Sequence, residues 1–275
     1  MEKLMIVSVA DGTAANINAS LLFYHNLFEV SSFLKRVYFL TLEGHVPDKY
    51  LEYLRHLGVD VVEYSISEEI MTDDPYRVKY LLKFFVDEVV SEKSTMLYLD
   101  PDHIIQRELT FDDGVSEGGT IMVSSEIKMV EESILKKIGI TYHCNTSLLY
   151  SNVGLLRTVC EGWLEEYDGI RESIGVRYRE EIAMMIAAKK RSMVMQPCNE
   201  IFQCTIDTYS KTSALCHYGG HFRETAVIKG ILNGYDYGKM ILDFDRYRSE
   251  EPGDCARVIC DIAQRYLKVI RENLG

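Results

Sequence analysis

Residues Met96–Ile105 read MLYLDPDHII, and this stretch indicates what kind of fold the chain adopts. The apolar run Met96–Leu99 lies between polar residues, as expected for a fully buried strand of a parallel sheet. The run ends in Asp100-Pro101-Asp102, which places two carboxylates at the carboxyl end of the strand. In open α/β sheets, ligands bind beside that end of the strands. The segment therefore predicts a central strand and a site next to it.

The residues before this segment alternate between apolar runs and amphipathic stretches. The apolar runs predict strands at Leu4–Val9, Val37–Leu42 and Val59–Tyr64. The amphipathic stretches predict helices at about Asn16–Phe28, at Asp48–Leu57 after Pro47, and at Tyr76–Val90. Alternation of this kind predicts an α/β fold with helices on both faces of the sheet.

After Asp102 the predicted elements are shorter strands and longer helices. Strands are expected at Thr120–Ser124 and Ser147–Ser151, and helices at Val153–Tyr167 and Arg179–Lys189. No repeat or Pro/Ser-rich linker divides the chain, so we expect one principal domain, residues 1–235, and a helical extension, residues 236–275, packed on it. In the extension, Pro252–Asn273 is amphipathic, and its apolar face either packs on the core or contacts a second copy or a partner.

The composition excludes several classes of protein. Of 275 residues, 47% are hydrophobic and 26% charged, which is typical of a globular domain and not of a disordered or fibrous chain. The net charge of −12 argues against nucleic acid and anionic lipid as partners, because both carry phosphate charge. Any phosphate ligand therefore requires a local cation.

The cysteines and the apolar runs indicate a compartment. Seven cysteines without a CxxC pair fit neither a zinc ribbon nor a secreted disulfide framework. No apolar run reaches the ~18 residues of a transmembrane segment, and the start of the chain does not read as a signal peptide. We therefore expect a soluble, cytoplasmic protein.

The Asp-Pro-Asp segment is a candidate metal site. Residues i and i+2 of an extended backbone point the same way, so Asp100 and Asp102 offer oxygen donors to one hard cation, Mg²⁺ or Mn²⁺. The same tripeptide is also common in exposed turns, and its spacing alone leaves both interpretations open.

A second segment, Cys216–Arg223 (CHYGGHFR), supplies complementary groups. His217 could give a nitrogen ligand to the same cation, which would favour Mn²⁺ over Mg²⁺. Gly220 and its neighbouring glycine allow the backbone to approach a ligand closely, and Arg223 could bind phosphate with both guanidinium nitrogens. Together the two segments favour a metal site for a phosphate-bearing ligand.

These segments together resemble the family 8 glycosyltransferases, the glycogenin and bacterial galactosyltransferase type. YLDPDHII is similar to their YLDxDxxV segment, and CHYGGHFR to their HYxGxxKPW segment. Asn145–Asn152 resembles the N(A/S)GVLLIN strand, Glu180-Glu181 falls at their D-Q pair, and Tyr76–Lys79 resembles their YxRLxL helix start. The order and approximate spacing agree over roughly residues 4 to 225.

The chain departs from these motifs at several positions. Gly12-Thr13-Ala14 replaces the Asn-Tyr that usually follows the first-strand Asp, and Ser147 replaces a glycine. Glu180-Glu181 replaces the D-Q pair, and Arg223-Glu224-Thr225 replaces Lys-Pro-Trp. The departures surround the nucleotide and the sugar, and they leave the metal ligands unchanged.

The resemblance implies a GT-A domain that transfers a hexose, with retention, from a nucleotide-diphosphate sugar, usually UDP-linked, to a glycan or small-molecule acceptor. It implies that Asp11 contacts the nucleoside and that Arg77 or Lys79 adds positive charge at the diphosphate. Glu180 would lie beside the sugar, or would simply be an acid in the first turn of a helix. Asn145 would bind substrate or satisfy the end of a strand.

Two other functions remain in consideration. A catalytically silent nucleotide-sugar or carbohydrate-binding module would keep the same fold. A sugar-1-phosphate nucleotidyltransferase would require a Gly-rich phosphate loop after the first strand, and residues 10–18 (ADGTAANIN) fit that requirement poorly.

Overall fold

A seven-stranded sheet forms the centre of the structure, a computed structural model of the chain. The residues it describes are 4–31, 36–66, 75–88, 94–109, 119–124, 130–170, 176–199, 203–205, 211–217, 265–266, 268–270 and 272–274. The strands of the sheet are β1 (Met5–Val9), β2 (Arg36–Leu42), β3 (Asp60–Tyr64), β4 (Thr95–Leu99), β6 (Thr120–Val123), β7 (Leu148–Asn152) and β8 (Val194–Pro197). Their order is β3-β2-β1-β4-β7-β6-β8.

The sheet is mixed and mainly parallel, as predicted. Strands β3, β2, β1 and β4 are mutually parallel, while β7 runs antiparallel to both β4 and β6. The MLYL run is therefore buried, but it has a parallel neighbour on only one side. From β1 the chain continues to β2 and β3 on one side of β1, whereas β4 lies on the other side of β1. The order of the strands therefore reverses between β1 and β4. In α/β sheets such a reversal creates the crevice in which ligands bind.

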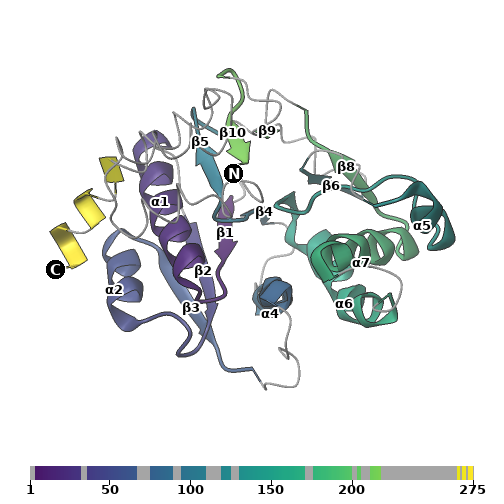
Figure 1. The fold of residues 1–275 in the computed structure, drawn as a ribbon, viewed down its shortest axis with the longest axis horizontal. Coiled ribbons are helices and arrows are strands. Elements are labelled where there is room, and N and C mark those ends of the chain that lie inside the picture. The colour runs from purple at the N-terminus through teal and green to yellow at the C-terminus, as the bar shows by residue number, and fades with distance from the viewer. Residues whose placement is uncertain are drawn as a thin grey trace, which may run out of the picture.

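Helices cover both faces of the sheet, which confirms the predicted α/β architecture (Figure 1). On one face, α1 (Ala14–Val30) and α2 (Asp48–His56) pack in a core with Ile6 and Leu97. On the other face, α4 (Leu81–Glu88), α6 (Val153–Gly169) and α7 (Val176–Lys190) pack with Val7 and Tyr98. Successive strand residues thus enter opposite cores, as the two-residue period of a strand requires.

Several details differ from the sequence prediction. The predicted helix from Tyr76 begins as a 3₁₀ turn, η1 (Pro75–Tyr80), before it continues as α4. Helix α7 starts at Val176, so Glu180 lies beyond the first turn and the helix-dipole explanation of this residue loses its basis. A short helix, α5 (Glu132–Lys137), and strand β8 were not predicted.

A second, three-stranded sheet lies beside the carboxyl end of β4. It consists of β5 (His103–Ile105), β10 (Leu215–His217) and β9 (Gln203–Thr205), in the order β5-β10-β9. Strand β5 begins directly after Asp102, so this small sheet joins the Asp-Pro-Asp segment to a part of the chain more than a hundred residues away.

The described residues near the C-terminus are helical and contact α1. Tyr266 stacks on His25, with ring centroids 5.5 Å apart, and Ile270 is buried in the same core. The predicted boundary between residues 235 and 236 lies outside the described residues, so the division into domain and extension stays a prediction. None of the helices in the described part of the chain combines the length and apolar character needed to cross a bilayer.

Gly12, directly after β1, approaches the backbone of the β2–α2 loop closely. Its φ is +79°, and a Cβ there would lie 2.5 Å from the main-chain oxygen of His45. We expect Gly12→Ala to lower the free energy of unfolding by about 2–4 kcal/mol, since it adds a clash to left-handed strain. Gly44→Ala is the matched control, because Gly44 has a φ of +74° but open space around it. Denaturant unfolding measures both, and an equal loss in the two variants would contradict the close approach.

Candidate active site

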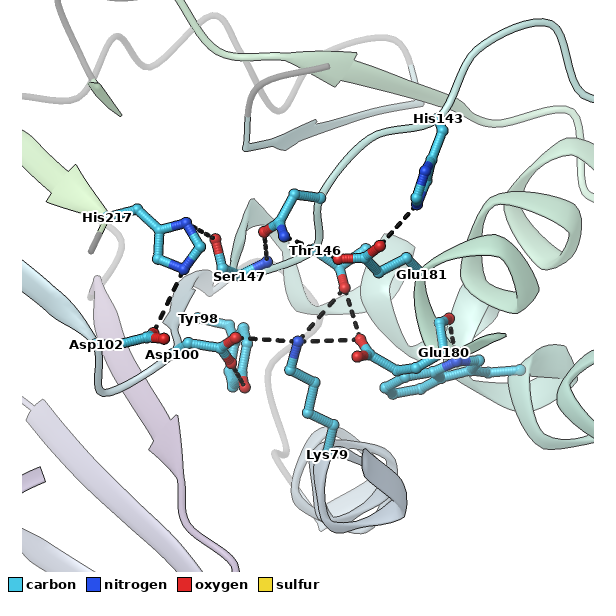
Figure 2. A network of polar contacts seen from close by, with 12 residues as sticks. Lys79, Tyr98, Asp100, Asp102, His143, Thr146, Ser147, Glu180, Glu181 and His217 are labelled. Carbon is cyan, nitrogen blue, oxygen red and sulfur yellow. Dashed lines mark hydrogen bonds and ion pairs between the residues drawn. The ribbon is translucent and has the colours of Figure 1, made fainter. Parts of the chain in front are cut away.

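The antiparallel pairing of β4 with β7 brings two segments together at the carboxyl end of β4. Leu99 pairs with Leu148, so the residues just before β7 lie beside those just after β4. The main-chain N–H of Asp100 donates to the carbonyl of Ser147 at 2.8 Å. Thr146, which precedes Ser147, therefore lies near the Asp-Pro-Asp segment, as Figure 2 shows.

His217 reaches the same place through the small sheet. Strands β10 and β5 are antiparallel with His217 paired to His103, one residue after Asp102. Nε2 of His217 lies 3.5 Å from Oδ1 of Asp102, and its Nδ1 lies 3.4 Å from the hydroxyl of Ser147. Two of the three predicted metal ligands, Asp102 and His217, are thus neighbours.

His103 supports the ring of His217 by stacking. The two imidazoles lie 4.7 Å apart at an interplanar angle of 16°. The Gln203 amide donates to Nε2 of His103, which leaves Nδ1 to donate to the carbonyl of Asp100. Burial, with a smaller contribution from His217, lowers the pKa of His103 to about 4. His103 is therefore a neutral, fixed surface for His217, and the sequence analysis did not predict this role.

Asp100 faces away from His217, toward Lys79. Its Oδ2 lies 3.2 Å from the Lys79 ammonium, and its Oδ1 accepts a hydrogen bond from the Tyr98 hydroxyl. Lys79 also lies 3.0 Å from Oε1 of Glu180, so one ammonium links two carboxylates from different elements (Figure 2). Burial disfavours the charge of Lys79, but Asp100 and Glu180 outweigh burial and raise its pKa above the usual value.

Glu180 is buried, with 3% of the residue exposed. The Thr146 hydroxyl donates to its Oε1 at 2.6 Å. Burial raises the pKa of Glu180 to about 7, even though Lys79 opposes that shift. Its main-chain carbonyl accepts the indole N–H of Trp163 at 3.0 Å, which anchors α7 to α6 at this point.

The neighbouring Glu181 belongs to a different set of contacts. His143 Nε2 lies 2.6 Å from Oε2 of Glu181, and the Asn145 amide donates to Oε1 at 2.8 Å. Asn145 also accepts from the N–H of Ser147 at 2.7 Å. Its side chain thus joins α7 to the start of β7, which favours the structural alternative for this residue.

Asp11 lies after β1, at the same edge of the sheet. Its Oδ1 accepts from the N–H of Thr13 at 2.9 Å and from the Thr13 hydroxyl at 2.8 Å. Thr13 in turn is the N-cap of α1. One carboxylate oxygen of Asp11 therefore orders the loop that leads into α1. This support of the helix cap is enough to explain an aspartate at this position.

The donor types at this edge fit a divalent cation, but the contacts of Asp100 direct it away from the other two donors. Carboxylate oxygens and an imidazole suit Mn²⁺, and Asp102 already lies beside His217. Asp100, however, is engaged by Lys79. Over the described ranges, no three His, Cys, Asp or Glu side chains are gathered as a set of metal ligands.

Some predicted residues lie outside what the structure describes. Gly220 and Arg223 fall there, as does the side chain of Arg77 within η1. The prediction did not include Tyr98, Thr146, His143 and His103. Tyr98 could have been inferred, because it lies two residues before Asp100 and so points to the same face. The contacts of His143 and Thr146 with α7 span more than 30 residues and carry no signal in the sequence.

Comparisons with known proteins identify the fold. No family model matches the sequence, and no curated protein shows significant similarity to it. Among solved structures, the galactosyltransferase LgtC in complex with donor and acceptor sugar analogs is similar with a TM-score of 0.57. The two sequences are 16% identical, and the match covers 79% of this chain and 87% of LgtC.

Two further structures are similar over most of the chain. The glycosyltransferase GlyE of Streptococcus pneumoniae TIGR4 matches with a TM-score of 0.54 and 16% identity, over 92% of this chain and 66% of GlyE. Mouse xyloside xylosyltransferase 1 matches with a TM-score of 0.51 and 11% identity, over 79% of this chain and 97% of the transferase. The chain therefore has the GT-A fold, in the form found in LgtC and these other glycosyltransferases.

Proposed function

We propose that the chain is a retaining glycosyltransferase that moves a hexose from a nucleotide-diphosphate sugar, with UDP as the expected nucleotide, to a glycan or small-molecule acceptor. The observation that carries the proposal is the meeting of Asp100, Asp102, His217 and Glu180 near the carboxyl end of β4, beside the reversal of strand order at which α/β sheets bind ligands. LgtC, which has the same fold, was solved with donor and acceptor sugar analogs.

The leaving group of such a reaction is a nucleotide diphosphate, whose negative charge grows as the glycosidic bond breaks. A divalent cation, Mn²⁺ or alternatively Mg²⁺, would neutralise that charge when bound. Asp100, Asp102 and His217 would hold it. Lys79 would supply a fixed positive charge beside the same group, and Arg77, Gly220 and Arg223 would add to the diphosphate site, as the sequence predicts.

Glu180 is the carboxylate that we assign to the sugar. Its second oxygen, Oε2, is not needed for the contacts with Lys79 and Thr146, both of which use Oε1. A carboxylate at this position would favour the positive charge that develops on the sugar ring as the leaving group departs. Asn145 would keep the β7 segment and α7 in register beside it, and Asp11 is assigned to the nucleoside.

The remaining assignments follow from the charge and from the cysteines. With a net charge of −12, the chain suits a soluble glycan or small acceptor better than an anionic lipid surface. Cys144, Cys160, Cys198 and Cys216 are free, which agrees with the proposed cytoplasmic location. A homodimer stays part of the same proposal, formed by another surface, since Tyr266 and Ile270 of the C-terminal helix are buried against α1.

A thermal-shift screen of nucleotide-sugars tests the proposal. We expect one donor class to raise the melting temperature when Mn²⁺ is present and not when EDTA replaces it, because ligands that bind the native state stabilise it. At 100 times the dissociation constant the stabilisation amounts to about 2.7 kcal/mol. The selected donor should then release free nucleotide diphosphate during turnover. Binding without turnover by any acceptor would favour the catalytically silent module, and no binding would refute the nucleotide-sugar site.

A further inference from the structure

Lys79 lies at the point where the candidate ligand Asp100 meets the rest of the site. Its side chain is 12% exposed, and its ammonium contacts Asp100 at 3.2 Å and Glu180 at 3.0 Å. The Thr146 hydroxyl lies at 3.5 Å, and the ring of Tyr98 lies below the ammonium at 5.7 Å. The ammonium therefore has partners on several sides, which come from three different segments: the end of β4, the residues before β7, and α7 (Figure 2).

The two carboxylates of the Asp-Pro-Asp segment are in different electrostatic surroundings. Asp102 lies beside His217, whereas both oxygens of Asp100 are engaged, one by Lys79 and one by Tyr98. Opposite charges that share a partly buried site attract strongly, because little water screens them. A cation that is to be held by both aspartates must therefore compete with Lys79 for Asp100.

We propose that Lys79 is the internal counter-ion of Asp100 and must release this carboxylate before it can ligate a divalent cation. The inference rests on the proposed function, because it assumes that Asp100 is a metal ligand. It makes binding of the metal alone weak. Once released from Asp100, Lys79 keeps its contact with Glu180 and offers its charge to the diphosphate, so that the metal and the nucleotide bind cooperatively.

The chain contains a matched control for this lysine. Lys83 lies four residues later, on α4, and pairs with Asp87 at 2.8 Å. Its side chain is more exposed, and its partner Asp87 lies on the same helix, outside the Asp-Pro-Asp segment. A Lys83→Met variant removes the same charge from the same region of the chain without freeing Asp100.

Titration with Mn²⁺ in the absence of nucleotide, followed by the electron paramagnetic resonance signal of free Mn²⁺, tests the inference. We expect Lys79→Met to bind Mn²⁺ about tenfold more tightly than the wild type, within the usual range of coupling between contacting charges. Lys83→Met should bind as the wild type does. In an Asp100→Asn background, Lys79→Met should no longer raise the affinity, because the competition is lost with the carboxylate.

The cooperative part is measured by repeating the titration with UDP. The gain in Mn²⁺ affinity on adding UDP should be smaller for Lys79→Met than for the wild type. If Lys79→Met loosens the fold, the double variant Lys79→Met/Glu180→Gln removes one facing carboxylate together with the lysine. It should show the same rise in Mn²⁺ affinity.

The possible results separate the two proposals. Unchanged or weaker Mn²⁺ binding by Lys79→Met overturns the counter-ion role, while a wild type that binds Mn²⁺ with UDP keeps the proposed function. A rise that persists in the Asp100→Asn background also overturns it, since the effect would then come from long-range charge. Absence of Mn²⁺ binding by the wild type, even with UDP, overturns both.

Discussion

Asp102→Ala is expected to abolish Mn²⁺-dependent binding of the nucleotide-sugar while leaving the protein folded. Asp102 is buried at the end of β4, and its Oδ1 lies 3.5 Å from His217. Removal of this anionic oxygen leaves an imidazole and the lysine-bound Asp100 to hold the cation. We expect the donor affinity in Mn²⁺ to fall at least about 100-fold, because a bound metal ion contributes several kcal/mol to the binding of such charge.

Calorimetry with the donor in Mn²⁺ and in EDTA measures this loss. The exposed Asp87→Asn variant on α4 serves as the control and should bind the donor normally. A thermal unfolding curve for each variant establishes that the fold is intact. Unchanged donor affinity of Asp102→Ala in Mn²⁺ would refute the metal assignment at this position.

Glu180→Gln is expected to lower turnover about 100-fold or more, with a smaller effect on donor affinity. The substitution keeps the size of the side chain and an oxygen that can accept from Thr146, but it removes the negative charge that we propose acts on the sugar. Electrostatic groups that act on the transition state contribute at this level. Glu166→Gln is the matched control, because Glu166 is also buried but pairs with Lys190, away from Asp100 and Asp102.

The same residue predicts a pH dependence. With a pKa of about 7, Glu180 becomes protonated as the pH falls through neutrality, so wild-type turnover should fall on acidification from pH 8 to 6.

The raised pKa of Glu180 also makes stability depend on pH. Between pH 4.5, the ordinary pKa of a glutamate, and about pH 7, the folded protein holds a proton that the unfolded chain does not. The contribution of Glu180 to stability is therefore lost as the pH rises through this window.

Glu180→Gln should remove this pH-dependent contribution to the free energy of unfolding. The difference in unfolding free energy between wild type and variant should change across pH 4.5–7 in favour of the variant as the pH rises, and denaturant unfolding at several pH values measures it. A difference that is constant with pH would show that Glu180 does not titrate in this range. A turnover profile that the variant shares with the wild type would assign the pH dependence to another group.

The parallel half of the sheet was predictable because its signals are local. Leu4–Val9 and Val37–Leu42 are apolar runs that a central strand requires, and the structure has β1 and β2 there within one residue. The place of the candidate site residues Asp100 and Asp102 was predictable for the same reason, since both directly follow β4. Position along a strand determines which edge of the sheet a residue occupies.

The pairing of charges across the site was not predictable. Lys79 was expected near a diphosphate, but its contacts with Asp100 and Glu180 join residues 21 and 101 positions apart, and sequence gives no distance at such separations. The true start of α7 was missed for a different reason. Its first turn, Val-Arg-Tyr-Arg, shows no apolar periodicity, so that the helix becomes visible only further along.

The hydrogen bond from Trp163 to the carbonyl of Glu180 gives the protein an intrinsic optical reporter. Trp163 is the only tryptophan of the chain, it is 3% exposed, and its ring lies 6.2 Å from that of Tyr80, next to Lys79. The fluorescence emission of Trp163 therefore depends on η1, which carries Lys79, and on α7, which carries Glu180. Displacement of η1 or α7 during ligand binding can be followed in the unlabelled wild-type protein, at the wavelength of a single fluorophore.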